Sequence, residues 1–201
     1  MAFPSRVAIA STNRHKLREL GRICGAWPVE WITVETYDGA WPEVDEPHPT
    51  YLENALEKAR TVASGLGIPA MADDSGVEVD ALGGDPGPRS ARFAGEAATD
   101  AENLAKLIDA ISAIRPEGRT ARYRCVAAVA WPEGREIHAE GVSEGALVTA
   151  PRGLGGFGYD PAFVPEGSDR TMAELTDEEK DRISHRGRAF RALGALLSTG
   201  R

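Results

Sequence analysis

Cysteine is scarce in this sequence, and its few thiols stand far apart. The 201 residues include 2 cysteines, Cys24 and Cys125, and both are flanked by apolar residues. No group of cysteines and histidines has the spacing of a zinc site. We therefore predict two buried free thiols, as is usual in a reducing cytoplasm.

Long hydrophobic runs are also missing. A membrane-spanning helix needs roughly 20 consecutive apolar residues, and no segment of the sequence approaches that length. The N-terminal region contains only a short apolar run at residues 7–10, which is unlike a signal peptide. These absences predict a cytoplasmic protein with no membrane partner.

Positive charge is in the minority, with 23 Lys and Arg against 31 Asp and Glu, a net charge of -8. Such a surface repels a nucleic-acid backbone, so no nucleic-acid partner is expected. Phosphates would have to be bound locally, by a few cations, a helix N-terminus or a metal ion. The sequence has neither a Walker A motif nor G-x-G-x-x-G, which excludes the P-loop and Rossmann types of nucleotide site.

Patterns typical of strands and of helices are mixed along the chain without a repeat. Short apolar or alternating runs predict strands at 6–11, 29–34, 70–72 and 77–82, and a hairpin of long strands at 120–131 and 135–142. Apolar residues at helical period predict helices at 14–24, after the capping patterns that begin at Thr50 and Thr99, and after Ser184. The predicted fold class is α/β, with a mixed central sheet flanked by helices in a single domain over residues 1–201.

The segment "STNRHK" lies where the first strand meets the first helix. Ligands of open α/β sheets bind at the carboxyl ends of strands, and helix N-termini attract anions. Ser11, Thr12 and Asn13 could donate to phosphate oxygens there, and Lys16 would add a positive charge. The alternative is an ordinary helix cap followed by a solvated lysine.

The segment "ADDSG" places two carboxylates side by side. Adjacent side chains of a strand point to opposite faces, so Asp73 and Asp74 should have different partners. One carboxylate could bind Mg²⁺, which prefers oxygen ligands. The alternative is an Asx turn, which Gly76 would permit.

Three further segments carry residues suited to a nucleotide. The acidic loop "PEVDEPHP" offers Asp45 and Glu46 as metal ligands, although acids in such loops are usually solvated. In "GGFGYDP" an aromatic ring could stack on a base and the carboxylate could accept its N–H groups; the alternative is a turn that buries both aromatics. In "SHRGRAF" two cations begin a helix, which the macrodipole disfavours unless an anion or a ligand carbonyl lies nearby. The residues concerned are Phe157, Tyr159, Asp160, His185 and Arg186, with Lys180 near another helix start. Together these segments describe a nucleoside triphosphate site with metal-assisted hydrolysis.

Five segments in this order resemble the Ham1/inosine-triphosphate pyrophosphatase family, the noncanonical purine NTP pyrophosphatases (XTP/dITP diphosphatases). They are "STNRHKLREL", "TYLENALEKA", "ADDSGVEVDALGGDPGPRSARFAG", "GGFGYDPAFVP" and "EEKDRISHRG". The resemblance extends over residues 6–197, nearly the whole chain. The resemblance implies two lobes on a long mixed sheet around an active-site cleft, and a homodimer. It implies Mg²⁺-dependent cleavage of the purine nucleoside triphosphates ITP, dITP and XTP to the monophosphate and pyrophosphate.

The resemblance also assigns roles by position. Asp74 is the catalytic proton acceptor and a Mg²⁺ ligand, and Ser75 contacts substrate. The remaining expected substrate-binding residues are Ser11, Thr12, Asn13, Arg14, His15 and Lys16 for the phosphates, Phe157, Gly158, Tyr159 and Asp160 for the base, and Lys180, His185 and Arg186 for the rest of the pocket.

One segment departs from the pattern of the family. Where the family commonly has Glu-Glu-Thr-Gly, this chain has "DEPH", so that its metal-binding glutamate aligns with Asp45 and Glu46 stands beside it. The second metal ligand therefore stays open between the two, and Asp73 is expected to be a supporting residue. Three alternative functions stay open: a pyrophosphatase for other modified nucleotides, a non-catalytic nucleotide-binding protein, and a serine hydrolase using Ser75, which lacks the G-x-S-x-G elbow.

Overall fold

The computed structural model describes residues 3–199 and contains one mixed six-stranded sheet. The strand order is β2-β1-β3-β4-β5-β6; β1 pairs in parallel with β2 and β3, while β5 and β6 are antiparallel. The strands are β1 Arg6–Ile9, β2 Glu30–Ile32, β3 Ala70–Val79, β4 Thr120–Ala130, β5 Glu136–Leu147 and β6 Phe163–Pro165. The helices are α1 Arg14–Ile23, α2 Tyr51–Leu66, α3 Asp100–Ile111, α4 Asp177–Ile183 and α5 His185–Thr199. The α/β class and the long hairpin are confirmed.

The chain forms two compact units. The first contains the residues up to Asp74, residues 125–141 and those from Arg186 onward; the second contains residues 75–124 and 142–185. The boundary therefore passes through two of the predicted site segments, after Asp74 and before Arg186. The single domain over residues 1–201 stays a prediction.

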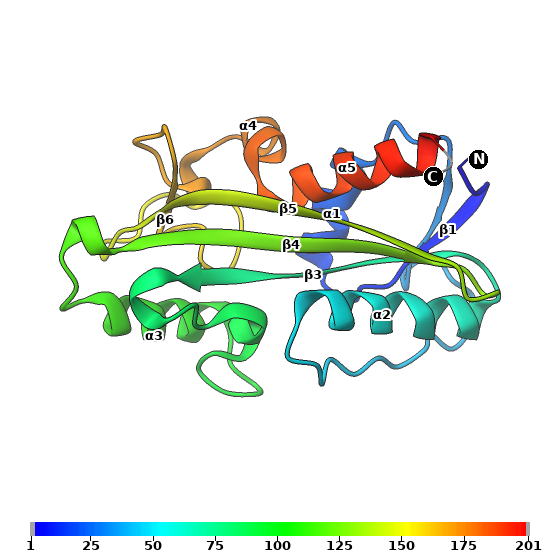
Figure 1. Ribbon diagram of the computed structural model, residues 1–201, viewed down its shortest axis with the longest axis horizontal. Coiled ribbons are helices and arrows are strands. Elements are labelled where there is room, and N and C mark those ends of the chain that lie inside the picture. The colour runs from blue at the N-terminus through cyan, green and yellow to red at the C-terminus, as the bar shows by residue number, and fades with distance from the viewer. Residues whose placement is uncertain (1–2, 200–201) are drawn as a thin grey trace. The chain divides into compact units, whose positions relative to one another are not determined.

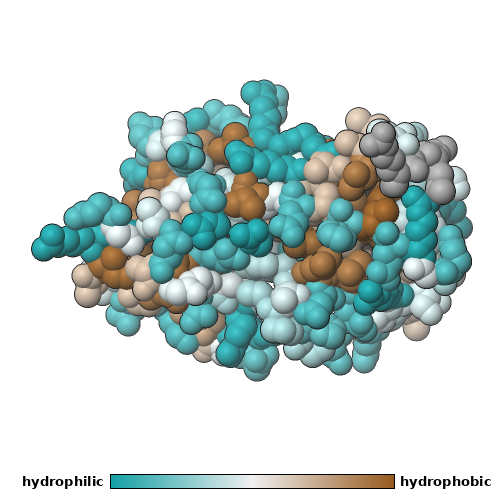
Figure 2. All heavy atoms as spheres, viewed as in Figure 1, coloured by the Kyte–Doolittle hydropathy of each residue, from teal (hydrophilic) through white to brown (hydrophobic). Residues whose placement is uncertain are grey.

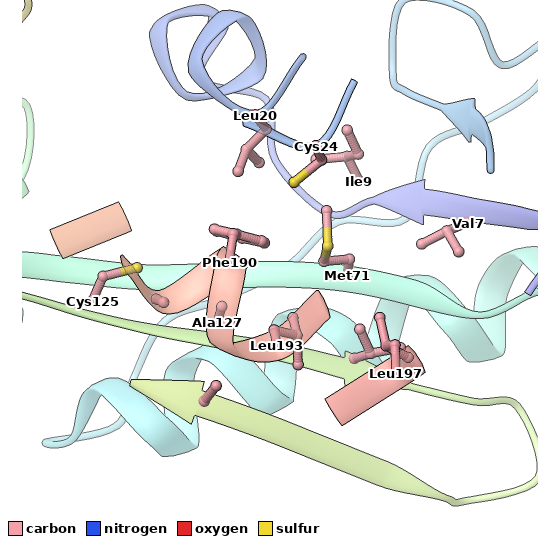
Figure 3. Packing of buried hydrophobic residues seen from close by; sticks show 13 residues of the cluster. Val7, Ile9, Leu20, Cys24, Met71, Cys125, Ala127, Phe190, Leu193 and Leu197 are labelled. Carbon is pink, nitrogen blue, oxygen red and sulfur yellow. The ribbon is translucent and has the colours of Figure 1, made fainter. Parts of the chain in front are cut away.

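Helices cover both faces of the strands in the first unit, with α1 and α5 on one face and α2 on the other (Figure 1). Phe190 and Leu193 of α5 and Leu20 of α1 point into a core that also contains Met71 of β3 (Figure 3). Each fully buried side chain of this size contributes about 1.5–3 kcal/mol. The apolar period expected for the first and last helices is thus confirmed, and Cys24 and Cys125 are buried and free, as predicted.

The second unit has its own core. Leu107 and Ile111 of α3 pack with Val77 and Val79 of β3, and a capping box begins α3 at Thr99, as its sequence predicts. Hydrophilic residues dominate the face of the molecule shown in Figure 2, with hydrophobic residues in small groups. In residues 3–199 no helix has both the length and the apolar character needed to cross a membrane.

Two boundaries predicted around the acidic pair are wrong. Strand β3 runs without a break from Ala70 to Val79, so no turn forms at Gly76. The reason is that apolar residues on both sides of the pair are buried and carry the strand through. The strand predicted at 77–82 ends before Leu82, because residues 80–82 form a 3-10 turn that Gly83 closes with a φ of 67°.

Candidate functional site

Charged side chains from five segments meet within the first unit. We call them the first-unit charge cluster; they comprise three cations and four anions, namely Lys16 and Glu19 of α1, Glu46, Lys58 of α2, Asp73 and Asp74 of β3, and Arg186 of α5. Buried charges are costly unless they are paired. In this cluster each ionised group has an opposite charge within hydrogen-bonding or ion-pair distance.

The two aspartates point to opposite faces of β3, as strand geometry predicts. Asp73 Oδ2 lies 3.1 Å from Lys16 Nζ and 3.1 Å from Arg186 Nη2, on the side of α1 and α5. Asp74 faces α2, where Oδ1 lies 3.4 Å from Lys58 Nζ and Oδ2 accepts from Asn54 Nδ2 at 3.2 Å. Both carboxylates are buried, and Asp73 lies between two cations. Its supporting role stays a prediction.

Arg186 is fully enclosed in the first turn of α5. Its guanidinium pairs with Asp73 and also donates from Nη1 to Glu19 Oε2 at 2.5 Å. Burial disfavours the ionised form of Asp73, but Arg186, Lys16 and Lys58 outweigh it and hold the pKa of this carboxyl well below its usual range. The anion expected beside this helix start is therefore supplied by the protein itself.

Asp74 has the opposite electrostatic character. Burial raises its pKa above the ordinary value, and the neighbouring Lys58 only partly opposes that shift. Burial also acts on Glu46, but there the attraction of Lys58 prevails and the pKa is lowered. Asp74 and Glu46 thus differ in pKa although both contact the Lys58 ammonium. In active sites such a difference lets one carboxyl exchange protons while the other stays ionised.

The same carboxylates are suited to a hard divalent cation. Glu46 Oε1 lies 2.9 Å from Lys58 Nζ, and Asp74 Oδ1 lies 3.4 Å from the same nitrogen. The two carboxylates therefore face a common position, where the lysine places a positive charge. Within residues 3–199 no group of three His, Cys, Asp or Glu could hold a metal. One or two carboxylates completed by water or substrate phosphate is the arrangement that Mg²⁺ prefers, so the residues present fit such an ion.

The structure distinguishes between the two acids of the Pro-rich loop. Asp45 is exposed, whereas Glu46 is partly buried and reaches the same lysine as Asp74. Asn54 of α2 helps to fix this loop, because its side chain accepts from the His48 backbone N–H at 2.9 Å and donates to the His48 carbonyl at 3.1 Å. Glu46 is therefore the better-placed partner of Asp74.

Lys58 and Asn54 have no assigned role in the sequence-based prediction. They lie four residues apart on α2, on the face that also buries Ala55 and Ala59. The sequence could have pointed to these two residues, because a lysine and an asparagine four positions apart within an apolar stripe are rarely buried without partners.

The segment before α1 forms a helix cap, and Lys16 is not solvated. Asn13 is the N-cap and accepts from the backbone N–H groups of His15 and Lys16, while Ser11 Oγ accepts from Asn13 N at 3.2 Å. The alternative of a helix cap is thus confirmed, but a solvated Lys16 is wrong, since its ammonium pairs with Asp73. Three of the other residues predicted to bind phosphate are exposed: Thr12, Arg14 and His15.

A second group of predicted residues lies within the second unit. Asp160 is buried, and its Oδ2 accepts from Lys180 Nζ at 2.6 Å and from the Phe157 backbone N–H at 2.8 Å. Lys180 Nζ also lies 5.1 Å from the centroid of the Phe157 ring. His185 stacks on Tyr123, which the sequence analysis did not single out, with ring centroids 4.5 Å apart. These contacts assemble an aromatic ring, a lysine, a carboxylate and an imidazole.

Other predicted residues of this group have structural partners. Tyr159 is buried in the core of the unit, and its hydroxyl donates to the Ser90 carbonyl at 2.7 Å. Gly158 N–H donates to Asp100 Oδ2 at 3.1 Å, and Ser75 is partly buried in β3. Lys180 lies in the last turn of the short α4, where the helix dipole favours a cation, so the argument from an unfavourable helix start is wrong for this residue.

Known proteins resemble the chain over nearly its full length. The sequence profile of the Ham1 family matches residues 7–196. The dITP/XTP pyrophosphatase of Geobacter sulfurreducens is 44% identical, with 94% of each chain covered, and that of Streptomyces coelicolor is 48% identical, with 94% of this chain and 95% of the relative covered. The solved structure of a HAM1 protein from Coxiella burnetii is 38% identical and covers 100% of both chains with a TM-score of 0.86. This chain belongs to the Ham1 family.

Proposed function

We propose that the chain hydrolyses noncanonical purine nucleoside triphosphates, ITP, dITP and XTP, to the monophosphate and pyrophosphate, with Mg²⁺ as cofactor. Its relatives over nearly the whole length are named dITP/XTP pyrophosphatases. Within this chain, one observation carries the proposal: Asp74 and Glu46 both contact Lys58. The pKa of Asp74 is raised and that of Glu46 is lowered. A homodimer and a cytoplasmic location stay predictions from the resemblance.

Asp74 and Glu46 are the residues that would hold the metal ion. Mg²⁺ supplies Lewis-acid polarisation of phosphate oxygens and offsets their charge. With three cations against four anions, the first-unit charge cluster keeps an excess negative charge that attracts such an ion when all seven groups are ionised. Asn54 and Lys58 of α2 hold the Asp74 carboxylate in one orientation, on the face of β3 opposite to Asp73.

Asp74 acts as the proton acceptor for the attacking water in this proposal. A general base works best when its pKa lies near the working pH, and burial shifts the pKa of Asp74 in that direction. Lys16 offsets charge that develops on the phosphates, and the Asp73–Arg186 pair fixes its ammonium. Asp73 is thus assigned to support and Asp74 to chemistry.

Recognition of the base is assigned to Phe157, Lys180 and His185. The Phe157 ring offers a surface for stacking, and a donor from His185 meets the 6-keto oxygen of hypoxanthine or xanthine. Adenine presents a 6-amino group instead, which would oppose donor to donor and leave buried groups unpaired. Arg186 takes no direct part, because Asp73 and Glu19 occupy its guanidinium.

A nucleotide panel tests the proposal. Pyrophosphate release from ITP, XTP, dITP, GTP, ATP and dUTP is measured with Mg²⁺ and with EDTA. We expect release from the first three nucleotides only, and only with the metal. Preference for dUTP would favour a pyrophosphatase for other modified nucleotides, and tight binding of ITP without turnover would favour a non-catalytic nucleotide-binding protein.

A further inference from the structure

Tyr123 of β4 contacts two residues of the second-unit group at once. Its ring stacks on the His185 imidazole with a centroid distance of 4.5 Å and an interplanar angle of 10°. Its hydroxyl donates to Asp160 Oδ1 at 3.2 Å. The Tyr123 side chain is itself buried, with 6% of the residue exposed. One side chain thus contacts both His185, which is assigned to base recognition, and the carboxylate that holds Lys180 and the Phe157 backbone.

The ring and the hydroxyl of Tyr123 do separate tasks. A parallel ring at stacking distance opposes tilting of the imidazole, since face-to-face contact is lost when either plane turns. Phe163 of β6 also packs on Tyr123, with centroids 4.6 Å apart, but at a tilted angle of 48° rather than in a parallel stack. The stack therefore fixes the plane in which His185 presents its ring nitrogens.

The hydroxyl of Tyr123 completes the coordination of Asp160. Oδ2 already receives the Lys180 ammonium and the Phe157 N–H, whereas the tyrosine donates to the other oxygen, Oδ1. With both oxygens held, the carboxylate cannot rotate, and Lys180 and the Phe157 backbone keep their positions. A change at the hydroxyl is thus transmitted to the lysine and the aromatic residue.

We infer that Tyr123 is a positioning residue that sets the purine selectivity of this site, its ring by fixing the plane of His185 and its hydroxyl by fixing Asp160. The inference rests on the proposed function, because it assumes that His185 reads the 6-position of the base. It adds a residue from a strand of the sheet to a group otherwise drawn from a loop and from the helices α4 and α5.

Two substitutions separate the two tasks. Tyr123→Phe keeps the stacked ring and removes the hydroxyl, so we expect KM for ITP to rise a few-fold and the preference for ITP over ATP to persist. Tyr123→Leu removes the stack, and we expect KM for ITP to rise about tenfold and the preference for ITP over ATP to fall by a similar factor, with kcat little changed. Phe163→Leu is the matched control, because it loosens the same core but leaves the Tyr123 ring and hydroxyl in the protein.

A spectroscopic measurement reports the stack without catalysis. The chain has 4 histidines, so protein labelled with ¹³C-histidine gives few Cε1–H signals, and loss of one signal in His185→Asn assigns it. We expect an upfield ring-current shift of the His185 signal in the metal-free native protein, retained in Tyr123→Phe and Phe163→Leu and lost in Tyr123→Leu.

The outcomes distinguish the two proposals. If the native protein shows no preference for ITP over ATP, the proposed function fails, whereas the NMR signal still tests the stack. If the native protein prefers ITP and Tyr123→Leu keeps both this preference and the native KM, the role of Tyr123 is overturned. An equal loss of selectivity in Phe163→Leu would also overturn it, because general loosening of the core would then suffice.

Discussion

Neutralising the two adjacent aspartates should have opposite consequences. Asp73→Asn is expected to lower the free energy of unfolding by about 3–5 kcal/mol, which is typical when one partner is removed from a buried ion pair. The substitution removes the carboxylate that pairs with both Lys16 and Arg186, and Arg186 is 2% exposed. For a chain of this size the loss corresponds to a fall in Tm of about 10 °C.

Asp74→Asn should instead keep the native stability or increase it. Lys58 retains Glu46 at 2.9 Å, and the asparagine oxygen can still accept from Asn54. The pKa directions agree with this contrast. Because the pKa of Asp73 is lowered on folding, its stabilisation is complete at neutral pH and is lost as the pH falls through the native pKa. Because the pKa of Asp74 is raised, its contribution is present below the unfolded pKa and is lost as the pH rises through the native pKa.

Chemical denaturation of both variants at pH 7 in EDTA provides the measurement, so that no bound metal contributes. Turnover of ITP with Mg²⁺ is then measured on the same preparations, and Asp74→Asn is expected to lack it. Equal stability of the two variants would refute the assignment of separate tasks to the two faces of β3. Near-normal turnover in Asp74→Asn would refute its role as proton acceptor.

Three further predictions concern the same unit. Glu46→Gln should raise the Mg²⁺ concentration needed for half-maximal activity by about tenfold or more, and Asp45→Asn should have a smaller effect; a metal titration of both variants decides between the two acids. Asn54→Ala should lower kcat for ITP more than it raises KM, because it frees both the Asp74 carboxylate and the loop at His48, and a steady-state comparison with the native protein measures this split. Burial raises the pKa of the Cys24 thiol to about 12 and raises that of the second thiol as well, so a thiol-specific reagent at pH 8 should label neither until denaturant is added; rapid labelling of the native protein would contradict the burial.

Local patterns predicted the helices and the long hairpin well, because apolar period and capping residues act over a few neighbouring positions. The cap at Thr50 is an example, since its hydroxyl accepts from the Glu53 N–H within one turn. Strand parity likewise placed Asp73 and Asp74 on different faces. The alternative of a turn at Gly76 is wrong, because a glycine only permits a turn, while burial of the flanking apolar residues favours a continuous strand.

The sequence by itself determined which segments carry the chemistry and that two adjacent aspartates must work apart. Only the tertiary structure decided their partners: Lys58 joins Asp74 to Glu46, Arg186 is held by Asp73 and Glu19, and Tyr123 joins His185 to Asp160. The physical reason is that these pairs are separated by up to 167 residues. Local periodicity carries no information over such distances, and the partners are selected by the requirement that each buried charge meet an opposite charge.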